Sequence, residues 1–490
     1  MLFVVWHLWA PSRLGITLHI DEAQYWTWSR ELAWGYYSKP PVIAALIAAS
    51  TALWGNGWIG VKGLTLALTT LTAWALAAWV HAMSGDARRG ALAALLALGS
   101  PLVLLLGFGA TTDVPLLLAW SLAAWALWVA LQRPESAWRW ALLGLTVGLG
   151  VLSKYTMLAF VPGACLAIVL AGPTPGHGWA VLRGGLLAAG AAALIVSPHV
   201  AWNVQADWPI WRHTLDITLQ RDDAALQRGL AAFALGQVVL LGPLALALLA
   251  WRSAEPGDDA PGRHGTQRRG MRFALAVSAP LLIVGLAQAA RGGAHVNWAA
   301  PALLGILAWL ALRAPLRAAP VATLLGLQTA LVIGLLHAPS VAAAVGQPWP
   351  CRLDFWARMR GWDQVWSELA RQLPSEPALV VGDSRAVLAH GAYHWRDRDV
   401  QWLAWDPARR ARHHFAWRQG VDETALASLL HGQRDRTVWL IAGDIDAVQP
   451  FAVRGMTPVE PQASAHWTNR CGRSVALWAW RLRPPQQDPS

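Results

Sequence analysis

Long apolar segments separated by short polar connections dominate the larger, N-terminal part of this 490-residue chain. A run of about 20 apolar residues is long enough to cross the hydrocarbon core of a bilayer as a helix. Charged residues make up 14% of the chain, whereas soluble domains carry about 25%. The sequence therefore predicts a polytopic α-helical membrane protein and excludes one large soluble core.

The apolar runs and the breaks between them predict about eleven transmembrane helices. We place these helices at residues 2–18, 60–82, 90–108, 114–131, 138–153, 155–171, 181–201, 229–251, 272–290, 296–313 and 319–337. This pattern predicts a transmembrane domain at residues 1–338, with outer loops at 19–59 and 199–228.

From about residue 339 the composition changes, because Arg and Asp become frequent and the long apolar runs stop. Two short apolar runs that end at Asp383 and Asp444 are typical of strands, as is the segment 475–481. The segment 362–373 has the spacing of an amphipathic helix. We therefore expect a small soluble α/β domain at residues 339–490.

The formal net charge is +11, but its distribution does not indicate nucleic-acid binding. The Arg and Lys residues are spread over short loops and do not form a basic stripe with exposed aromatic residues. Cytoplasmic loops of membrane proteins are enriched in Arg and Lys. If the loop with Asp21 is outside, more basic residues fall inside than outside, most clearly in the loop from Arg252 to Arg272. The same orientation places the C-terminal domain outside.

The three cysteines are too few for a disulfide framework. Cys165 lies in an apolar run and is expected to be a packing residue. Cys351 and Cys471 both lie in the polar C-terminal part, and they would pair if that part is in an oxidising compartment.

With Asp21 outside, the polar residues that interrupt the apolar pattern fall on the outer side. Ionisable groups at membrane depth are costly and are usually functional, so their convergence predicts one site at the outer surface. Short loops also need polar residues, and helix capping alone would explain an Asp just before a Pro. Lys154 could simply extend its ammonium group to the membrane interface, and a lone His such as His295 is often structural. The residues concerned are Asp21, Glu22, Lys39, Asp113, Lys154, Asn203, His295 and Asn297.

The segment from His19 to Ile47 is the most informative part of this set. It opens with the adjacent carboxylates Asp21 and Glu22, continues through closely spaced aromatic residues, and contains Lys39 before two prolines. Trp and Tyr favour the membrane interface, because the ring is apolar and its polar atom stays hydrated. An interfacial helix with solvated charges is the simpler interpretation of the same pattern.

Residues 21–26, DEAQYW, and 35–41, GYYSKPP, resemble the first outer loop of bacterial family 39-type glycosyltransferases. These are the protein-mannosyltransferase-like and aminoarabinose-transferase-like enzymes with the GT-C fold. The similarity continues through residues 112–115, 148–155, 202–203 and 297–298, so that it covers about residues 19–300 in order. The chain departs from the family pattern at Gln24, where an aromatic residue is usual, and at Ser38, where an acid is common.

The resemblance implies a membrane glycosyltransferase of the bacterial inner membrane that acts on the periplasmic face. Such an enzyme moves a sugar from a polyprenyl-phosphate donor to a lipid, glycan or protein acceptor, here with inversion. Asp21 would be the catalytic base or would orient the acceptor, with Glu22 in support, because a carboxylate can accept the hydroxyl proton. Lys39, and after it Lys154 or Arg291, would bind the donor phosphate.

The resemblance also leaves open a divalent metal ion as the only cofactor, held by Glu22 and Asp113. The remaining residues are expected to support the site. They are Asp113, Tyr37, Asn203, His295 and Asn297.

Two other classes of protein are alternatives. A transporter or flippase of a lipid-linked substrate predicts ionisable groups near the middle of the membrane and internal repeats, whereas here the groups lie at helix ends without a repeat. A scaffold protein predicts that Asp21 is replaceable. No nucleotide-binding loop, hydrolase elbow or zinc motif is present to support ATP-driven transport or standard hydrolysis. The sequence does not identify the sugar, the acceptor, the oligomeric state or the role of the C-terminal domain.

Overall fold

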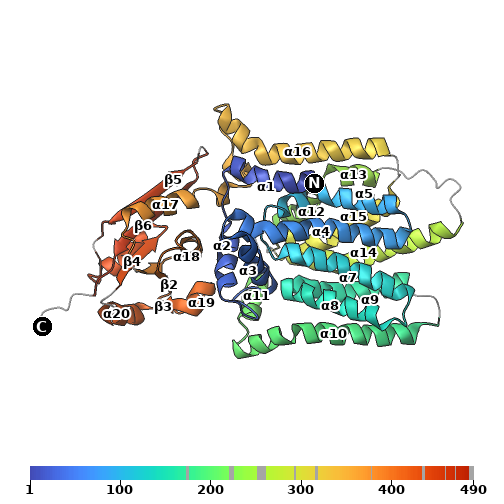
Figure 1. Ribbon diagram of the computed structural model, residues 1–490, viewed down its shortest axis with the longest axis horizontal. Coiled ribbons are helices and arrows are strands. Elements are labelled where there is room, and N and C mark those ends of the chain that lie inside the picture. Colours follow the sequence, from blue (N-terminus) through green and yellow to red (C-terminus); the bar gives the residue numbers. More distant parts are fainter. Residues whose placement is uncertain are drawn as a thin grey trace. The chain divides into compact units, whose positions relative to one another are not determined.

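The computed structural model describes residues 1–172, 176–219, 226–250, 261–291, 294–314, 318–376, 378–432, 436–457, 459–469 and 471–484. The chain forms two compact units (Figure 1). The helical unit comprises Met1–Leu8 and Ala33–Gly334, and the sheet unit comprises Trp9–Leu32 and Leu335–Ser490. The sheet unit therefore combines a segment near the N-terminus with the C-terminal part. Residues 220–225 of the expected outer loop and residues 251–260 of the Arg-rich loop lie outside the described ranges.

The helical unit is built from helices of very different lengths. Helices α1 (Leu2–Leu14) and α16 (Ala318–Ala344) each run from one unit into the other. The remaining helices are α3 (Val42–Trp54), α4 (Trp58–Ser84), α5 (Ala87–Leu98), α6 (Pro101–Leu106), α7 (Asp113–Gln132), α8 (Ala137–Ser153), η1 (Tyr155–Ala159), α9 (Phe160–Ala171), α10 (Gly178–Gln205), α11 (Pro209–Leu219), α12 (Leu226–Leu241), α13 (Pro243–Ala250), α14 (Pro261–Ala289), η3 (Val296–Ala299) and α15 (Ala300–Arg313).

Six described helices are long and apolar enough to cross a membrane, and the bent pair α12–α13 would be a seventh. They confirm the predicted polytopic helical class, whereas the expected number of about eleven is not reached by this criterion. Several expected spans are broken. The segment 90–108 divides where Ser100 caps α6 and Pro101 begins it. The segment 229–251 bends by 91° next to Gly242, which has a φ of 85°.

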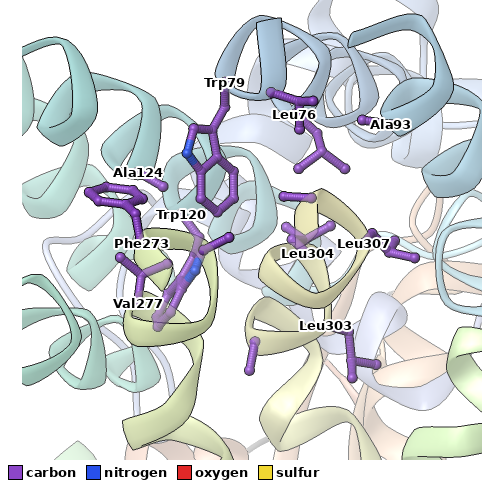
Figure 2. Close-up of a cluster of buried hydrophobic side chains, with 14 of the residues drawn as sticks. Leu76, Trp79, Ala93, Trp120, Ala124, Phe273, Val277, Leu303, Leu304 and Leu307 are labelled. Carbon is purple, nitrogen blue, oxygen red and sulfur yellow. The ribbon is translucent and has the colours of Figure 1, made fainter. Parts of the chain in front are cut away.

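The core of the helical unit is a continuous cluster of large apolar side chains. Trp79, Trp120 and Phe273 are fully buried together with Leu304 (Figure 2). Small residues let the helices approach closely, as at Gly305, where a Cβ would lie 1.9 Å from the Ser278 hydroxyl of α14. This packing fixes the ends of α7, α8 and α15, from which site residues project.

The sheet unit contains one six-stranded sheet in the order β3-β2-β1-β4-β6-β5. Strands β1, β2, β3 and β4 are parallel, and β6 pairs antiparallel with both β4 and β5. The strands occupy the orange and red part of the chain (Figure 1). They are β1 (Ala378–Gly382), β2 (Val400–Trp405), β3 (Gly420–Val421), β4 (Thr437–Ala442), β5 (Ala463–Thr468) and β6 (Ser474–Arg481).

Helices complete the sheet unit, and apolar clusters cover the sheet on both faces. The helices are α2 (Ile20–Arg30), α17 (Trp362–Gln372), α18 (Arg385–His394), α19 (His414–Gln419), α20 (Glu423–Gly432) and α21 (Gln449–Ala452), with short 3-10 turns η4 (Cys351–Leu353), η5 (Ala357–Met359) and η6 (Ile445–Val448). The strands expected to end at Asp383 and Asp444 are confirmed as β1 and β4. A disulfide joins Cys351 to Cys471.

Candidate active site

Three of the expected site residues meet in the helical unit. Asp113 is the first residue of α7, Lys154 follows the end of α8, and Asn297 lies in η3. The Lys154 ammonium donates to Asp113 Oδ1 at 2.8 Å, and the Asn297 amide donates to Asp113 Oδ2 at 3.0 Å. Thr112, rather than Asp113, is the N-cap of α7. Because both carboxylate oxygens are used by distant residues, helix capping does not account for Asp113.

The Asp113–Lys154 pair lies largely out of solvent. The side chains are only 6% and 15% exposed, respectively. A buried ion pair is retained at a considerable desolvation cost, and it holds its members in one geometry when hydrogen bonds satisfy the remaining atoms. The pair, with Asn297 as the second donor, therefore fixes a cation at the point where three helix ends meet.

A second polar network begins at Tyr155, the residue that follows Lys154 in the chain. The Tyr155 hydroxyl lies 2.7 Å from His199 Nε2, and the Asn203 amide lies 3.2 Å from the same nitrogen. His199 Nδ1 faces the backbone carbonyl oxygen of Trp34. A carbonyl only accepts, so Nδ1 carries the proton and Nε2 accepts from Tyr155. Sequence reasoning selected Asn203 but not its partner His199.

The network holds the loop that carries Lys39. His199 donates to the backbone carbonyl of Trp34, and the ring of Trp202 packs directly on Gly35. The Tyr36 N–H donates to the Lys39 carbonyl at 3.1 Å, which closes a tight turn around the half-buried Lys39. The ring of Tyr37 lies 5.1 Å from that of His213. Burial, and after it the nearby charge of Asp216, raises the pKa of Tyr37.

Replacing Gly35 by Ala is expected to disturb this loop, because a Cβ at that position would lie 2.4 Å from two ring atoms of Trp202. Overpacking of this kind costs about 1–3 kcal/mol. We expect a lower unfolding temperature and weaker donor binding in the purified protein. Gly57→Ala is the matched control, because Gly57 precedes α4 with a φ of −71° and a Cβ there would meet nothing within 4 Å. Equal behaviour of the two variants would contradict the proposed packing role.

Asp21 and Glu22 lie in the sheet unit, in the first turn of α2. The carboxylate of Glu22 is buried, and its Oε2 accepts from the His19 N–H at 2.7 Å. The His19 ring accepts from the Asp21 N–H, so that His19 and Glu22 form a reciprocal cap. Glu22 therefore has a structural contact in addition to the supporting role expected for it.

Arg385, the first residue of α18, holds the Asp21 carboxylate. Its Nη2 donates to Asp21 Oδ1, and its Nε donates to the side-chain oxygen of Gln24. Helix α18 packs against α2 within the sheet unit. Arg385 was not anticipated from the sequence.

The other expected residues have fewer contacts in the structure. Arg291 is exposed in the turn after α14, and its N–H donates to the Gln288 carbonyl. His295 is exposed, and its ring lies 5.5 Å from that of Trp298. Lys62, which lies within the expected span 60–82 and was not selected as a site residue, is fully buried in α4, where it donates to the Phe108 carbonyl at 2.8 Å.

The described residues include no group of three or more His, Cys, Asp or Glu side chains that could hold a metal ion. The oxygens of Asp113 accept from Lys154 and Asn297, and Glu22 Oε2 accepts from the backbone of His19. These surroundings do not fit the expected metal site at Glu22 and Asp113. Metal dependence stays a prediction.

Comparison with known proteins gives a match in sequence. Residues 38–202 match the family model described as dolichyl-phosphate-mannose-protein mannosyltransferase. The lipid A galacturonosyltransferase RgtD of Rhizobium johnstonii is 33% identical over 315 residues, which cover 63% of this chain. The alignment also spans 63% of that relative's own length, which is less than two thirds of it.

Comparison with solved structures gives a match in fold over nearly the whole chain. The crystal structure of ArnT from Cupriavidus metallidurans bound to undecaprenyl phosphate has a TM-score of 0.63 at 16% identity, and 97% of each chain is covered. The apo structure of the same protein has a TM-score of 0.50 at 13% identity, covering 99% of this chain and 98% of that one. At these identities the likeness concerns the fold alone.

The apolar helices and the fold match define a multi-pass membrane protein with the GT-C fold. The matches agree with the resemblance expected from the motifs: part of the chain is similar in sequence to a mannosyltransferase family and to a lipid A galacturonosyltransferase, and the chain shares its fold with ArnT.

Proposed function

We propose that the protein is a glycosyltransferase that moves a sugar from a polyprenyl-phosphate-linked donor to a lipid, glycan or protein acceptor. The observation that carries the proposal is the mannosyltransferase family match over residues 38–202, because this segment contains Lys39, Asp113 and Lys154. The name of the Rhizobium relative, a lipid A galacturonosyltransferase, and the undecaprenyl phosphate bound to ArnT support a lipid-phosphate donor.

In the proposed reaction, the acceptor hydroxyl oxygen attacks the anomeric carbon of the donor sugar from the side opposite the phosphate. The new C–O bond forms as the bond to the phosphate oxygen breaks, and the configuration inverts. Asp21 accepts the hydroxyl proton. The polyprenyl phosphate leaves with the bonding electron pair, so no nucleotide is needed.

The cations of the helical unit are proposed to bind the phosphate of the donor. Lys39 is the first choice, and Lys154 or Arg291 is the second. A fixed cation stabilises the charge that develops on the departing phosphate, and Asp113 with Asn297 would hold Lys154 for this purpose. Supporting roles are proposed for Glu22, Tyr37, Asn203 and His295.

We propose a location in the bacterial inner membrane, with the active site and the soluble C-terminal domain on the periplasmic side. The Cys351–Cys471 disulfide supports an oxidising compartment for that domain. We also propose that α1, α3, α8 and the η1–α9 segment cross the membrane. Together with the six long helices and the bent pair, they would also give eleven spans, but with α3 from the expected outer loop 19–59 in place of the expected span at 90–108.

The test uses the purified protein in liposomes with a panel of radiolabelled polyprenyl-phosphate sugars and a panel of lipid, glycan and protein acceptors. We expect the wild type to consume one donor and Asp21→Asn to lower turnover by about 100-fold or more, because a general base contributes 10²–10⁴-fold. Asp21→Asn should still bind the donor, whereas Lys39→Ala should bind it more weakly.

The matched control for Asp21→Asn is Glu31→Gln, at the other end of α2, where Glu31 is exposed and pairs with Arg418. It should turn over at the wild-type rate. If no donor is consumed, or if Asp21→Asn is as active as the wild type, the proposal is wrong. Donor that crosses the bilayer without being consumed would indicate a flippase.

A further inference from the structure

The ion pair between Arg385 and Asp21 involves the carboxylate of the proposed base. Arg385 Nη2 donates to Asp21 Oδ1, while Asp21 Oδ2 lies 3.6 Å from the His19 ring. A carboxylate paired with a guanidinium is a weaker proton acceptor than an unpaired one, because the opposite charge stabilises its ionised form. The side chains of Arg385 and Asp21 are 33% and 40% exposed, so a ligand from solvent can reach the pair.

The charge around Arg385 favours an anion. Five histidines interact electrostatically with one another or with Arg385 within the same unit, and burial keeps four of them, His390, His394, His413 and His414, neutral near pH 7. Burial, and after it the Arg385 charge, lowers the pKa of His413 to about 4. Burial lowers the pKa of His394 to about 4 and that of His390 well below its usual range. The lasting positive charges of this cluster therefore include Arg385 and also Arg396, which acts on His394, and Asp21 is the acidic partner of Arg385.

Arg385 also lies at the edge of the sheet where open α/β folds bind ligands. The chain leaves β1 through Asp383 and Ser384, enters α18, and returns to β2 on one side of β1, whereas β4 lies on the other side. Ligands of such sheets bind outside the carboxyl ends of the strands at this switch point. The turns after β1 and β4 are joined here, because Asp383 Oδ2 accepts from the Gly443 N–H at 3.0 Å.

Asp383 provides a second polar group that points to a ligand. Its Oδ1 is buried and has no hydrogen-bond partner among the described residues. Burial is the main cause that raises the pKa of Asp383. An unsatisfied buried oxygen is uncommon in native proteins, and the hydroxyl of a sugar would satisfy it. Asp383 and Arg385 stand two residues apart in the turn that leads from β1 into α18, and a carboxyl oxygen and a guanidinium from one turn are suited to a sugar that carries an anionic group.

We propose that Arg385 binds a phosphate or carboxylate group of the acceptor glycan, and that this exchange of partners frees Asp21 to act as the base. The proposal rests on the proposed function, because it uses the role assigned to Asp21. The planar guanidinium matches both phosphate and carboxylate in geometry. Until an anionic acceptor arrives, Asp21 stays paired with Arg385 and is a weaker base, so that water is activated less and the donor is hydrolysed more slowly.

The test compares Arg385→Gln with wild type, using lipid A with its phosphate groups and the same lipid after dephosphorylation. We expect Arg385→Gln to raise the KM for the phosphorylated acceptor about tenfold or more, because hydrogen bonds between charged groups are strong. The preference for the phosphorylated acceptor should disappear, and donor hydrolysis without an acceptor should rise. Arg385→Lys should restore part of the preference, because the charge is kept.

Arg418→Gln is the matched control, since Arg418 on α19 pairs with Glu31 at the end of α2, and both side chains are exposed. It should leave KM, acceptor preference and donor hydrolysis unchanged. An equal loss of kcat on both acceptors in Arg385→Gln would mean that Arg385 only supports α2, and would overturn the proposal. A raised KM for the donor instead would assign Arg385 to the donor phosphate and would also overturn it.

A binding measurement separates this proposal from the proposed function. Glucosamine 1-phosphate and glucosamine are titrated into the purified wild type and Arg385→Gln by calorimetry. Tighter binding of the phosphorylated sugar that is lost in Arg385→Gln supports the anion site even if no transfer is found. Equal binding of both sugars to wild type and variant, in a protein that does transfer sugar, would overturn the anion site alone.

Discussion

Replacing Asp113 by Asn is expected to abolish sugar transfer and to destabilise the helical unit. The variant leaves the Lys154 ammonium, whose side chain is 15% exposed, without its counter-charge. Removing one member of a buried ion pair costs about 3–5 kcal/mol. The geometry of Asn297 is lost as well, because an amide at position 113 cannot accept from both Lys154 and Asn297 as a carboxylate does. Denaturant unfolding and the donor-consumption assay measure the two effects.

The control for this variant is Asp207→Asn in the same unit. Asp207 pairs with Arg212 at 2.5 Å, but the two side chains are 74% and 65% exposed, and exposed pairs contribute little to stability. Asp113→Asn with Lys154→Met should regain stability without regaining transfer, since the unpaired charge is removed together with the proposed phosphate ligand. Normal unfolding and normal transfer in Asp113→Asn would show that the pair is incidental.

Replacing Cys351 and Cys471 by Ser is expected to have the second largest effect. The disulfide closes a sequence separation of 120 residues, which contains most of the strands of the sheet. In the chain-entropy model, a loop of about 100 residues corresponds to about 4–5 kcal/mol of stabilisation. We expect the sheet unit of the variant to unfold at a clearly lower temperature. Thermal unfolding followed by circular dichroism, with and without reductant, measures the change.

The control is Cys165→Ser, because Cys165 is an exposed free thiol in α9, and the packing role expected from the sequence is wrong. It should unfold like the wild type, and reductant should lower the unfolding temperature of both by the same amount. The double Ser variant should be insensitive to reductant. If it unfolds at the wild-type temperature, the disulfide does not stabilise the sheet unit.

The polar residues of the helical unit could be selected from the sequence, but their pairing could not. Asp113, Lys154 and Asn297 each interrupt an apolar pattern, and a charge at such a place has a cost that requires a reason. Their sequence separations of 41 and 184 residues are closed by helix packing, which a single sequence does not reveal. Because the partners of Asp113 could not be seen in the sequence, helix capping was an equally acceptable explanation for this residue.

Two residues that were not predicted, Arg385 and Lys62, have sequence neighbours that give no sign of a functional or buried position. Arg385 opens a short helix in a part of the chain that is rich in Arg, and nothing in its neighbours indicates a partner 364 residues away. Lys62 stands near the beginning of a long apolar helix, where a Lys that reaches the interface is equally reasonable. Its burial depends on the Phe108 carbonyl and the Trp58 ring. By contrast, β1 and β4 were predictable, because short apolar runs that end in acidic turns are a local pattern.

Because residues 9–32 fold with residues 335–490, the order of synthesis decides when the chain can become active. The ribosome produces α2 early, but Arg385 is synthesised 364 residues after Asp21. At about 5–20 residues per second, this interval lasts roughly 20–70 s. During that time, helices of the intervening segment can enter the membrane while α2 still lacks its partner helix. A nascent chain that stops before α18 therefore carries the proposed base without the residue that controls it.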